Sequence, residues 1–358
     1  MPTSPHISPV DLTRFTAGLF RAYDVTAFEA QAVAECLVEN NLRGHDSHGI
    51  VQICGYLKQL KKGELVAGAA FESLCETDSL LVADAHYGFG FVQCARLVDA
   101  LEPKARAQGV ACGTLRNSGH VGRLGTWAER VAARGLAGLV TSNDNGILQC
   151  VAPPGGTVPR ISTNPFAIAV PTGGDLLALD ISTSIVANGK VLLDYLAGRD
   201  CPPGWLQDAS GAPTTDPAVR FTDPRGTLLP MGGEQGYKGF GLALLLDILV
   251  GGLSGGLCPP GTADALNVNN VLLIVWDPDR FAGHAHFTEQ ADRLIDYVRA
   301  SPLKAGVELI RLPGDRANAL FEERSRLGIP IDEKTWQALV KLADERNVSV
   351  PPLGVEES

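Results

Sequence analysis

Residues 110–142 read VACGTLRNSGHVGRLGTWAERVAARGLAGLVTS, and this stretch decides the fold class. Its apolar run 110–115 predicts a strand, the Gly-rich run 116–125 predicts a loop, and 126–134 predicts a helix. Residues 136–142 predict a second strand. Ligand-binding groups concentrate in loops that follow the ends of strands. This strand–loop–helix–strand unit therefore predicts a mixed α/β protein with a candidate binding loop at 116–125.

Helices are predicted on both sides of this unit. Ser8 with Asp11, and Thr26 with Glu29, have the spacing of capping boxes, which begin helices. Asp332 is expected to cap a helix near the C-terminus. We expect the helical segments of the two chain ends to pack together as one unit. Further helices are predicted over 50–60, 92–108 and 236–249 (the last one buried), and further strands over 79–83, 166–170, 177–181 and 270–276.

The composition describes a folded chain rich in turns. Of its 358 residues 40 are Gly and 23 are Pro, whereas ~12 % for the two together is usual. Apolar residues make up 45 % and charged residues 20 %, which excludes a disordered chain. The glycines have no three-residue period, so a collagen helix is also excluded. The length predicts two domains or one large domain.

Charge and cysteine content limit the partners and the compartment. The net charge of −10 argues against nucleic acid, because phosphate backbones need clustered Lys and Arg. The start MPTSPHISPV has neither a basic flank nor an apolar core, so no signal peptide is expected. The longest apolar stretch, 242–253, falls short of the ~20 residues that span a bilayer, so no membrane partner is expected. Eight cysteines without a C-x-x-C pair predict free thiols and a cytoplasmic protein.

The usual nucleotide and metal motifs are missing from the sequence. The stretch 239–244 lacks the third glycine of G-x-G-x-x-G, and the P-loop pattern fails before Gly189-Lys190. Ser254 lies in a G-x-S-x-G match, but a helix is predicted before it, where a nucleophile elbow needs a strand. His284 and His286 have no Cys or carboxylate at ligand spacing and are expected in a surface loop. No metal site is predicted.

Two compact histidine motifs are the candidates for proton chemistry, because His exchanges a proton near neutral pH. The first is GHDSHG at 44–49, and a helix after it would align His48, Gln52 and Tyr56 on one face. The second is NSGHVG at 117–122, directly after a predicted strand. Each has a structural alternative, a helix start with surface imidazoles for the first and a turn with a structural histidine for the second.

Six motifs in order resemble one known family: RGHDSHGI at 43–50, RNSGHVGRLG at 116–125, STNPFAIAVP at 162–171, LDISTSIVANGKV at 179–191, GYKGFGLALLLDIL at 236–249 and LPGDR at 312–316. They are similar to the type 2 malate/L-lactate dehydrogenases, NAD(P)H-dependent oxidoreductases without a Rossmann fold. The likeness runs from about residue 8 to residue 345. The GHDSHGI wording and the GAPTTDPAV segment at 211–219 resemble the hydroxycarboxylate dehydrogenase B branch most.

The resemblance implies an architecture. It implies an α/β fold in which the cofactor lies against a central, largely antiparallel sheet and a helical domain is built from both chain ends. The division is then 1–70 for an N-terminal helical part, 71–280 for the cofactor-binding domain and 281–358 for a C-terminal helical part packed with the first. The resemblance also implies a homodimer with its sites near the subunit interface.

The resemblance also implies roles for individual residues. Catalysis falls to His48, Ser47 and His120, with His48 as the acid–base group. Substrate binding falls to Gln52, Tyr56, Asn117, Thr163 and Asn164. Cofactor binding falls to His120, Asp180, Ile181, Ser182, Thr183, Ser184, Tyr237, Lys238, Gly314, Asp315 and Arg316, for NAD or NADP.

One position departs from the family pattern. Many members carry Arg four residues after the catalytic histidine, where it pairs with the substrate carboxylate. Here the position is Gln52, which can hydrogen-bond a carboxylate but cannot neutralise it. Another cation is then expected to hold the carboxylate, or the substrate differs in kind. The candidate cations are Arg116, Arg123, Arg160 and Lys190.

The resemblance implies hydride transfer between nicotinamide C4 and C2 of a 2-oxo or 2-hydroxy acid, with His48 exchanging the proton. A second hypothesis keeps the scaffold and reduces a cyclic imine carboxylate, such as piperideine- or pyrroline-2-carboxylate, or another ketimine. A third is a binding protein that has lost the chemistry. A small carboxylate is the expected ligand.

Overall fold

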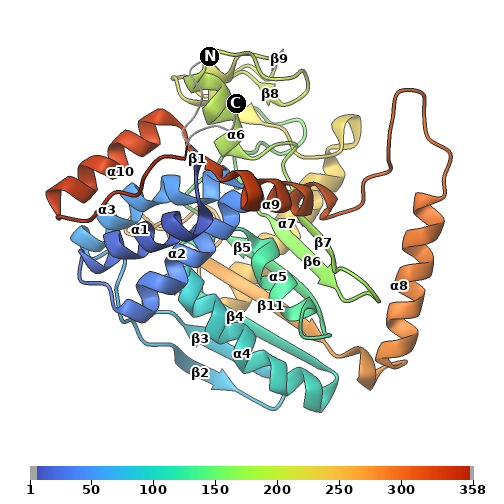
Figure 1. Cartoon of the computed structure of the whole chain (residues 1–358). Coiled ribbons are helices and arrows are strands. Elements are labelled where there is room, and N and C mark those ends of the chain that lie inside the picture. Colours follow the sequence, from blue (N-terminus) through green and yellow to red (C-terminus); the bar gives the residue numbers. More distant parts are fainter. Residues whose placement is uncertain (1–5, 355–358) are drawn as a thin grey trace.

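The computed structural model describes residues 6–354. Residues 1–5, which are part of the N-terminal stretch examined for a signal peptide, and residues 355–358 lie outside the described part. A seven-stranded sheet forms the centre of the described part (Figure 1). In the order in which they lie across the sheet, its strands are β2 (Glu72–Glu76), β3 (Leu80–Asp84), β4 (Val110–Ser118), β11 (Asn269–Trp276), β5 (Ala137–Asn143), β6 (Phe166–Val170) and β7 (Leu177–Ile181).

The sheet is largely antiparallel. Strands β3 and β4 run parallel, joined by the crossover helix α4 (Gly90–Gln108). Every other neighbouring pair in this sheet is antiparallel. The central strand β11 comes from far along the chain and lies between β4 and β5, so it closes the unit that residues 110–142 begin. The predicted α/β class with a central, largely antiparallel sheet is confirmed.

Helices cover both faces of the sheet. On one face α4 and α5 (Leu124–Ala132) pack on the strands, with Gly138 of β5 against Val131 of α5. Helix α7 (Tyr237–Ser254) packs on the other face, where Asn143 donates a hydrogen bond to Asp247. Gly138 and Asn143 are an odd number of residues apart on one strand and so point to opposite faces.

The two chain ends meet in a helical layer beside the sheet (Figure 1). The N-terminal helices α1 (Pro9–Arg21), α2 (Ala27–Leu42) and α3 (Ile53–Lys62) contact α9 (Asp315–Leu327) and α10 (Glu333–Glu345). Strand β1 (His6–Ile7) pairs with β12 (Ile329–Pro330). The caps predicted at Ser8, Thr26 and Asp332 are confirmed, because each side chain accepts a backbone N–H of its helix.

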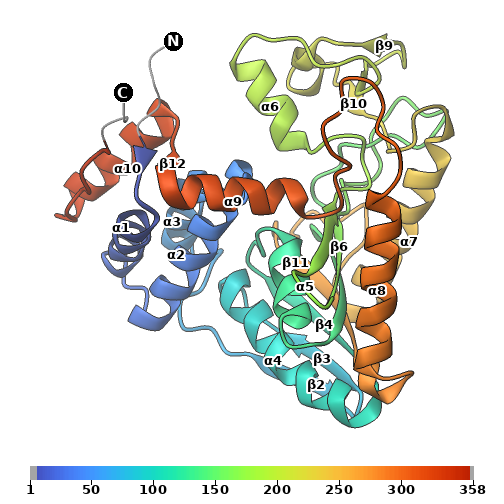
Figure 2. The same cartoon turned by 45° about the vertical axis from the view of Figure 1, so that its right-hand side comes forward.

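Helix α8 (His284–Arg299) departs from this arrangement. It lies across the central sheet from α1 and α2 (Figure 2), and none of its residues is buried. An ion pair of 3.4 Å joins Arg299 to Asp315 at the start of α9. The segment 281–358 therefore contributes one helix outside the helical layer and two helices inside it.

Most of the chain between β5 and α7, apart from strands β6 and β7 of the central sheet, forms a lobe with a core of its own. It holds helix α6 (Asn188–Leu196) and a small sheet of β10 (Thr227–Leu228), β8 (Leu206–Gln207) and β9 (Pro213–Thr214). Val151, Val191 and Leu206 are buried in this second cluster, separate from the large core of the helical layer and the main sheet.

Helix α7 differs from the buried helix predicted over 236–249. It extends to Ser254, and its face away from the sheet is solvent-exposed and apolar, with Leu245, Ile248 and Leu253 on it. By length and composition alone α7 could cross a bilayer, although a third of it (33 %) is buried inside the fold. Asp247 on the inner face accepts hydrogen bonds from Asn143 and Asn164, which is typical of a helix packed on its own domain.

A close backbone approach links the sheet to the loop of His120. Gly90 opens α4, and a Cβ there would lie 2.3 Å from the carbonyl oxygen of Gly119 and 2.4 Å from that of His120. We expect Gly90→Ala to push α4 away from this loop, lowering the free energy of unfolding by about 1–3 kcal/mol and reducing turnover. Urea unfolding monitored by circular dichroism measures the first effect. Gly174→Ala is the control, since nothing lies within 4 Å of a Cβ there. Equal stability of the two variants would contradict the expectation.

Candidate active site

Three side chains from separate elements form one hydrogen-bonded chain. Nδ1 of His48 lies 3.1 Å from Nε2 of His120, and Nδ1 of His120 lies 2.6 Å from the hydroxyl oxygen of Tyr56. The two imidazoles are stacked, with ring centroids 5.1 Å apart and planes 7° apart. His120 comes from the loop after β4, whereas His48 and Tyr56 come from the N-terminal helical part. The two histidine motifs of the sequence therefore form a single site.

The helix predicted over 50–60 is largely confirmed, because α3 begins at Ile53, but residues 50–52 form a 3₁₀ turn in place of its first turn. Residues 46–48 form a separate 3₁₀ turn. Gly49 lies between the two turns and is extended at φ −91° and ψ −150°, so His48 does not continue the helix. His48 and Tyr56 consequently meet through His120 and not along a helix face.

Asn40 and Asn41 of α2 hold this irregular segment. The amide of Asn40 donates to the carbonyl oxygen of His48 at 2.9 Å. The carbonyl of the Asn41 side chain accepts the N–H of Ile50 at 2.9 Å. Gly49 lies against the same side chain, and a Cβ at Gly49 would be 2.1 Å from its oxygen. The backbone on both sides of His48 is therefore fixed by amides that sequence inspection did not single out.

An ion pair from the far end of the chain completes the support. Arg324 of α9 binds both carboxylate oxygens of Asp46, at 2.7 and 3.1 Å, and also donates to the carbonyl oxygen of Asn41. Such a bidentate pair fixes orientation as well as distance. Asp46 thereby connects the loop of His48 to the C-terminal helical part.

The histidines of the site are neutral at neutral pH. Burial and, to a lesser extent, nearby His45 lower the pKa of His48 to about 4, although Asp180 opposes this shift. Burial likewise lowers the pKa of His120 to about 3 and the pKa of His45 to about 4. Burial raises the pKa of Tyr56, so its hydroxyl keeps its proton. The hydrogen-bonded chain is therefore uncharged in the free protein.

A buried cluster of charges lies behind the histidines. Arg123 makes a bidentate pair with Glu129, with distances of 2.8 and 2.7 Å, and its side chain is 2 % exposed. The carboxylate of Asp180 accepts the N–H of Gly125 at 2.7 Å, at the N-terminus of α5. Burial raises the pKa of Asp180, while Arg123 and the α5 backbone favour its charged form.

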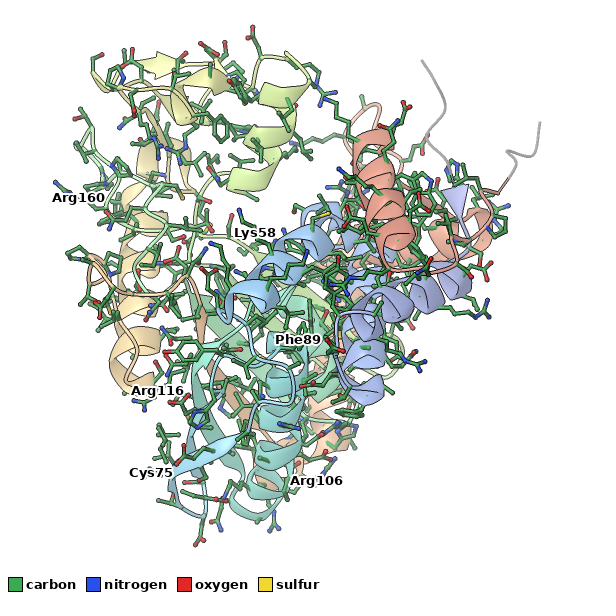
Figure 3. The ribbon with its side chains drawn as sticks, turned by 90° about the vertical axis from the view of Figure 1, so that its left-hand side faces the viewer. Lys58, Cys75, Phe89, Arg106, Arg116 and Arg160 are labelled. Atoms are coloured by element: carbon green, nitrogen blue, oxygen red, sulfur yellow. The ribbon has the colours of Figure 1, made fainter. Side chains whose placement is uncertain are left out.

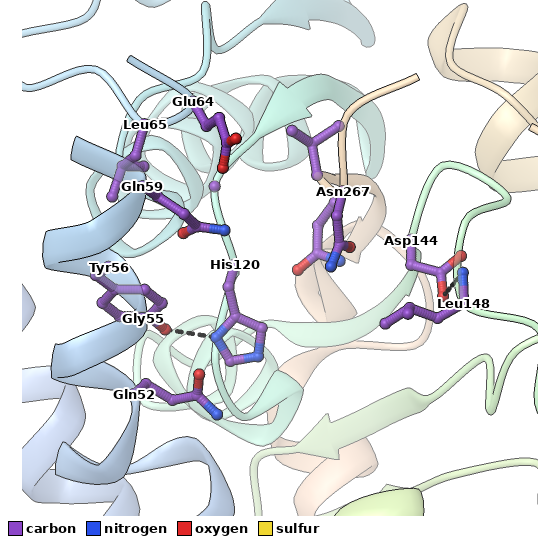
Figure 4. Close-up of a pocket in the computed structure, with 13 residues that line it drawn as sticks. Gln52, Gly55, Tyr56, Gln59, Glu64, Leu65, His120, Asp144, Leu148 and Asn267 are labelled. Atoms are coloured by element: carbon purple, nitrogen blue, oxygen red, sulfur yellow. Dashed lines mark hydrogen bonds between the residues drawn. The ribbon is translucent and has the colours of Figure 1, made fainter. Parts of the chain in front are cut away.

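A cavity of about 300 Å³ opens beside His120 and Tyr56 (Figure 4). Gln52, Gln59 and Leu65 lie on the side of α3, and Asp144, Leu148 and Asn267 lie on the opposite side. The amide nitrogen of Gln52 donates to the carbonyl oxygen of Ser47 at 2.7 Å, so the cavity adjoins the catalytic loop. Its size suits a small organic acid.

The predicted cofactor segments all lead into helix N-termini. Residues 180–184 precede α6, Tyr237 and Lys238 open α7, and Gly314 with Asp315 opens α9. None of these three helices has a side-chain cap. Their first N–H groups can therefore take the phosphates of a dinucleotide, and the residues present fit such a group. The start of α6 also adjoins the loop, because a Cβ at Gly189 would lie 3.3 Å from the Cβ of Ser47.

Two predicted substrate-binding amides are directed elsewhere. The amide of Asn117 donates to both carboxylate oxygens of Asp84, at 3.2 and 3.0 Å. The amide of Asn164 donates to Ala243 and Asp247 of α7 and is buried. The backbone oxygen of Thr163 accepts the hydroxyl of Thr183 at 2.8 Å, which ties two predicted site segments together. Asn117 and Asn164 thus shape the loops around the cavity and are absent from its wall.

None of the four candidate cations lines the cavity. Arg116 forms an ion pair of 2.7 Å with Asp84, and Arg123 forms one of 2.7 Å with Glu129. Arg160 is exposed at the outer edge of the molecule (Figure 3), and Lys190 lies over the ring of Trp205. The expectation that one of them replaces the family arginine has no support in this arrangement.

The remaining motifs carry no chemistry. Ser254 is the buried last residue of α7 and is preceded by a helix, so it is not in a nucleophile elbow. His284 and His286 lie in the first turn of α8, not in the predicted loop. Within residues 6–354 no three His, Cys, Asp or Glu side chains are grouped to bind a metal.

The cavity residues Gln59, Glu64, Asp144, Asn267 and Asn269 were not singled out from the sequence, and neither was His45. They come from α3, from the loop after it and from the ends of β5 and β11. Only His45 belongs to a motif recognised beforehand. For Asp144, Asn267 and Asn269 the available signal was their position at the end of a strand, and for Gln59 and Glu64 the sequence offered none.

A neutral imidazole pair beside a small cavity, three predicted cofactor segments at helix N-termini without side-chain caps, and the absence of a Rossmann motif are typical of an enzyme of a non-Rossmann α/β class. Residues 7–340 match the family described as malate/L-lactate dehydrogenase, so the chain belongs to that family. Dehydrogenases of this family use nicotinamide cofactors.

Individual relatives cover nearly the whole chain. Hydroxycarboxylate dehydrogenase B of Escherichia coli O157:H7 is 35 % identical over 346 residues, which is 95 % of this chain and 93 % of that protein. The structure of malate dehydrogenase from Pyrococcus horikoshii OT3 is similar with a TM-score of 0.87 at 28 % identity, covering 98 % and 97 % of the two chains. Delta1-piperideine-2-carboxylate reductase from Pseudomonas syringae is similar with a TM-score of 0.81 at 30 % identity, covering 94 % and 99 %.

The lowered histidine pKa values predict acid sensitivity of the fold. An unfolded histidine takes up a proton below about pH 6.5, whereas His45 and His48 in the folded chain do so near 4. Stability is therefore full above about pH 6.5 and is lost as the pH falls towards 4, by about 1.4 kcal/mol per pH unit for each such histidine.

We expect His45→Gln to reduce the dependence of the unfolding free energy on pH by the contribution of one histidine, about 1.4 kcal/mol per pH unit. Urea unfolding at pH 4.5, 5.5, 6.5 and 7.5 measures this dependence. The matched control is His286→Gln on exposed α8, which should keep the slope of the parent protein. An unchanged slope in His45→Gln would show that His45 is not buried as a neutral ring.

Proposed function

We propose that this protein is an NAD(P)-dependent dehydrogenase that transfers hydride between nicotinamide and C2 of a 2-oxo or 2-hydroxy acid. The observation that carries the proposal is the uncharged chain His48–His120–Tyr56 next to a cavity of small-acid size. Membership of a dehydrogenase family supports it. We place the protein in the cytoplasm, as its free cysteines suggest.

His48 is the proposed acid–base residue. Its Nδ1 is engaged by His120, which leaves Nε2 for the substrate oxygen. In the oxidation direction neutral His48 accepts the proton of the 2-hydroxyl group at Nε2, and in reduction Nε2–H protonates the oxygen at C2. The bound nicotinamide supplies the hydride acceptor or donor. A lowered pKa suits the first role, because the base is unprotonated before the substrate arrives.

The paired histidines would share the transferred proton. With Nδ1–H of His48 donating to Nε2 of His120, and Nδ1–H of His120 donating to the oxygen of Tyr56, Nε2 of His48 is a lone-pair base. With both hydrogen bonds reversed, Nε2 of His48 carries a proton and is an acid. Tyr56 lines the cavity, so its hydroxyl can exchange protons with water there. The chain therefore lets one site work in both directions.

Other residues would orient the reaction. Ser47 lies between His48 and the start of α6, where its hydroxyl can position the substrate oxygen. Asp180 stabilises the imidazolium form of His48 after proton uptake. Residues 181–184, Tyr237, Lys238 and 314–316 would hold the dinucleotide, NAD or NADP.

Imine reduction is the second candidate, because of the likeness to a piperideine-2-carboxylate reductase. A panel of 2-oxo acids with and without amine, followed at 340 nm, separates the two reactions. Turnover of amine-free acids alone would exclude imine reduction. Titration of NAD(P)H fluorescence tests the non-catalytic alternative, which would be favoured by an absence of both binding and oxidation.

We also propose that the protein acts as a homodimer. The outer face of α7 presents Leu245, Ile248, Leu249 and Leu253 at helical spacing, all exposed. Leu294 and Tyr297 of α8 are exposed as well. Apolar stripes of this size on a monomer mark interaction surfaces.

Replacing the acid–base residue tests the proposed reaction. We expect His48→Asn to lower kcat by about 10²–10⁴-fold and to leave the Kd for NAD(P)H, measured by fluorescence, within a few-fold of the parent. Steady-state rates with a panel of 2-hydroxy acids provide the measurement, and His286→Gln is the matched control. Near-normal turnover of His48→Asn would remove His48 from this role.

The subunit interface has a separate test. We expect the double change Leu245→Glu and Ile248→Glu to convert a dimer into monomers, because two charges per subunit would be buried in an apolar contact. Sedimentation velocity gives the mass in solution. Lys58→Glu on α3 serves as a charge control outside α7. A parent protein that sediments as a monomer would contradict the proposal.

A further inference from the structure

The cavity beside His120 is lined without a permanent cation. Among the described residues that line it, two carry carboxylates, Glu64 and Asp144, and none is Lys or Arg. His120 is neutral, since burial lowers its pKa to about 3. A second acid group on a substrate would therefore meet two carboxylates and no counter-charge, which is costly in a confined site.

Gln52 presents an acceptor to this cavity. Its Nε2 must face the carbonyl oxygen of Ser47, 2.7 Å away, because a carbonyl oxygen can only accept. The side-chain oxygen Oε1 is then left for a ligand, and it points towards the ring of His120 (Figure 4). Because Oε1 can only accept a hydrogen bond, a ligand that binds to it must donate one from a hydroxyl or an N–H group.

Asp144 presents a second acceptor across the cavity. It is 8 % exposed, and its carboxylate accepts hydrogen bonds from the backbone N–H groups of Leu148, at 3.2 Å, and Ile147 and from the side chain of Ser162, while nearby Asp247 adds a second negative charge. Burial raises the pKa of Asp144 to about 6, so the group is mostly ionised above pH 7. Within residues 6–354 no Lys or Arg lies within 4 Å of it. A buried carboxylate without a cationic partner gains from a hydrogen-bond donor.

Glu64 differs from Asp144. It lies near the cavity mouth and forms an ion pair of 3.1 Å with Lys62, with both side chains partly exposed. Its charge is already balanced and hydrated there. Two acceptors therefore face the cavity without a neighbouring cation, the neutral amide oxygen of Gln52 and the carboxylate of Asp144, on opposite sides of the cavity (Figure 4).

We infer that the protein acts on 2-hydroxy or 2-oxo acids whose tail ends in a hydrogen-bond donor, a hydroxyl or an ammonium group, and discriminates against a second carboxylate or a sulfonate. This inference rests on the proposed function, because it places the substrate tail between Gln52 and Asp144 while C2 lies at His48. A tail of two to four carbons suits the cavity of about 300 Å³. A hydroxyl can donate to Gln52 or Asp144, and an ammonium group pairs best with Asp144.

The test uses three 2-hydroxy acids of four carbons that differ only at C4. Malate carries a carboxylate there, 2,4-dihydroxybutanoate a hydroxyl and 4-amino-2-hydroxybutanoate an ammonium group. We expect kcat/KM for either donor-bearing acid to exceed that for malate at least tenfold, with NAD or NADP at saturation. The relative rates of the second and third acids distinguish a hydroxylated from a cationic substrate. Six-carbon analogues of the same series test tail length.

Variants of the two acceptors separate this inference from a general effect on the site. We expect Gln52→Arg to reverse the preference in favour of malate, because it places a cation in the cavity. We expect Asp144→Asn to lower kcat/KM for the ammonium substrate at least tenfold and to raise that for malate, because the change removes one of the carboxylates that disfavour a second acid group. Glu76→Gln is the control, at an exposed carboxylate of β2 that pairs with Lys104 at 2.8 Å away from the cavity, and it should change neither value more than about twofold.

The outcomes are distinct. If malate is the best of the three acids and Gln52→Arg gives no gain, the inference about the tail is overturned while the proposed dehydrogenase activity stands. If all acids of both lengths are inert with either cofactor, the proposed function itself fails and the inference falls with it. If the donor-bearing acids lead but Asp144→Asn and Gln52→Arg leave the order unchanged, the assigned position of the tail is wrong.

Discussion

The contact between Nδ1 of His48 and Nε2 of His120 is the constraint on which the rest of the site depends. It joins a loop of the N-terminal helical part to a loop of the central sheet, two units with separate supports. Asn40, Asn41 and Arg324 fix the first loop, and the close approach of Gly90 fixes the second. A shift of either unit would break a hydrogen bond that requires its two rings within a few tenths of an ångström.

Charged and neutral groups occupy different positions around this contact between the two histidines. Full charges lie behind the histidines, where Arg123, Glu129 and Asp180 compensate one another. The histidines are neutral, and the cavity in front of them has acceptors and no cation. Desolvation therefore acts on the groups that must change protonation during a reaction, while paired charges behind them hold the geometry. The arrangement favours a base that is ready to accept a proton over an acid that is already charged.

Local signals predicted much of the fold. Two kinds of signal depend only on neighbours in sequence and were confirmed. They are the helix caps at Ser8, Thr26 and Asp332 and the strand–loop–helix–strand order of residues 110–142. The helix over 50–60 was confirmed from Ile53, but the alignment of His48 with Tyr56 along one helix face was not, because amides of α2 stabilise an extended backbone at Gly49, a contact that spacing does not reveal. The apolar pattern of α7 predicted burial, but it could not show that half of the helix faces outwards. The ordered motifs pointed to His48, His120 and Tyr56. The roles expected of Asn117 and Asn164 were not supported, because their partners Asp84 and Asp247 lie far away in sequence.

The ion pair between Asp46 and Arg324 joins residues 278 positions apart, and β1 pairs with β12 next to it. During synthesis the loop of His48 therefore emerges early, whereas Arg324, which holds Asp46 of this loop, is made only when nearly the whole chain is complete. A truncated chain that lacks α9 also lacks Arg324, so it holds His48 on a loop without this anchor. Completion of the polypeptide and assembly of the site thus coincide, so a fragment released early from the ribosome would carry the sequence motif without its geometry.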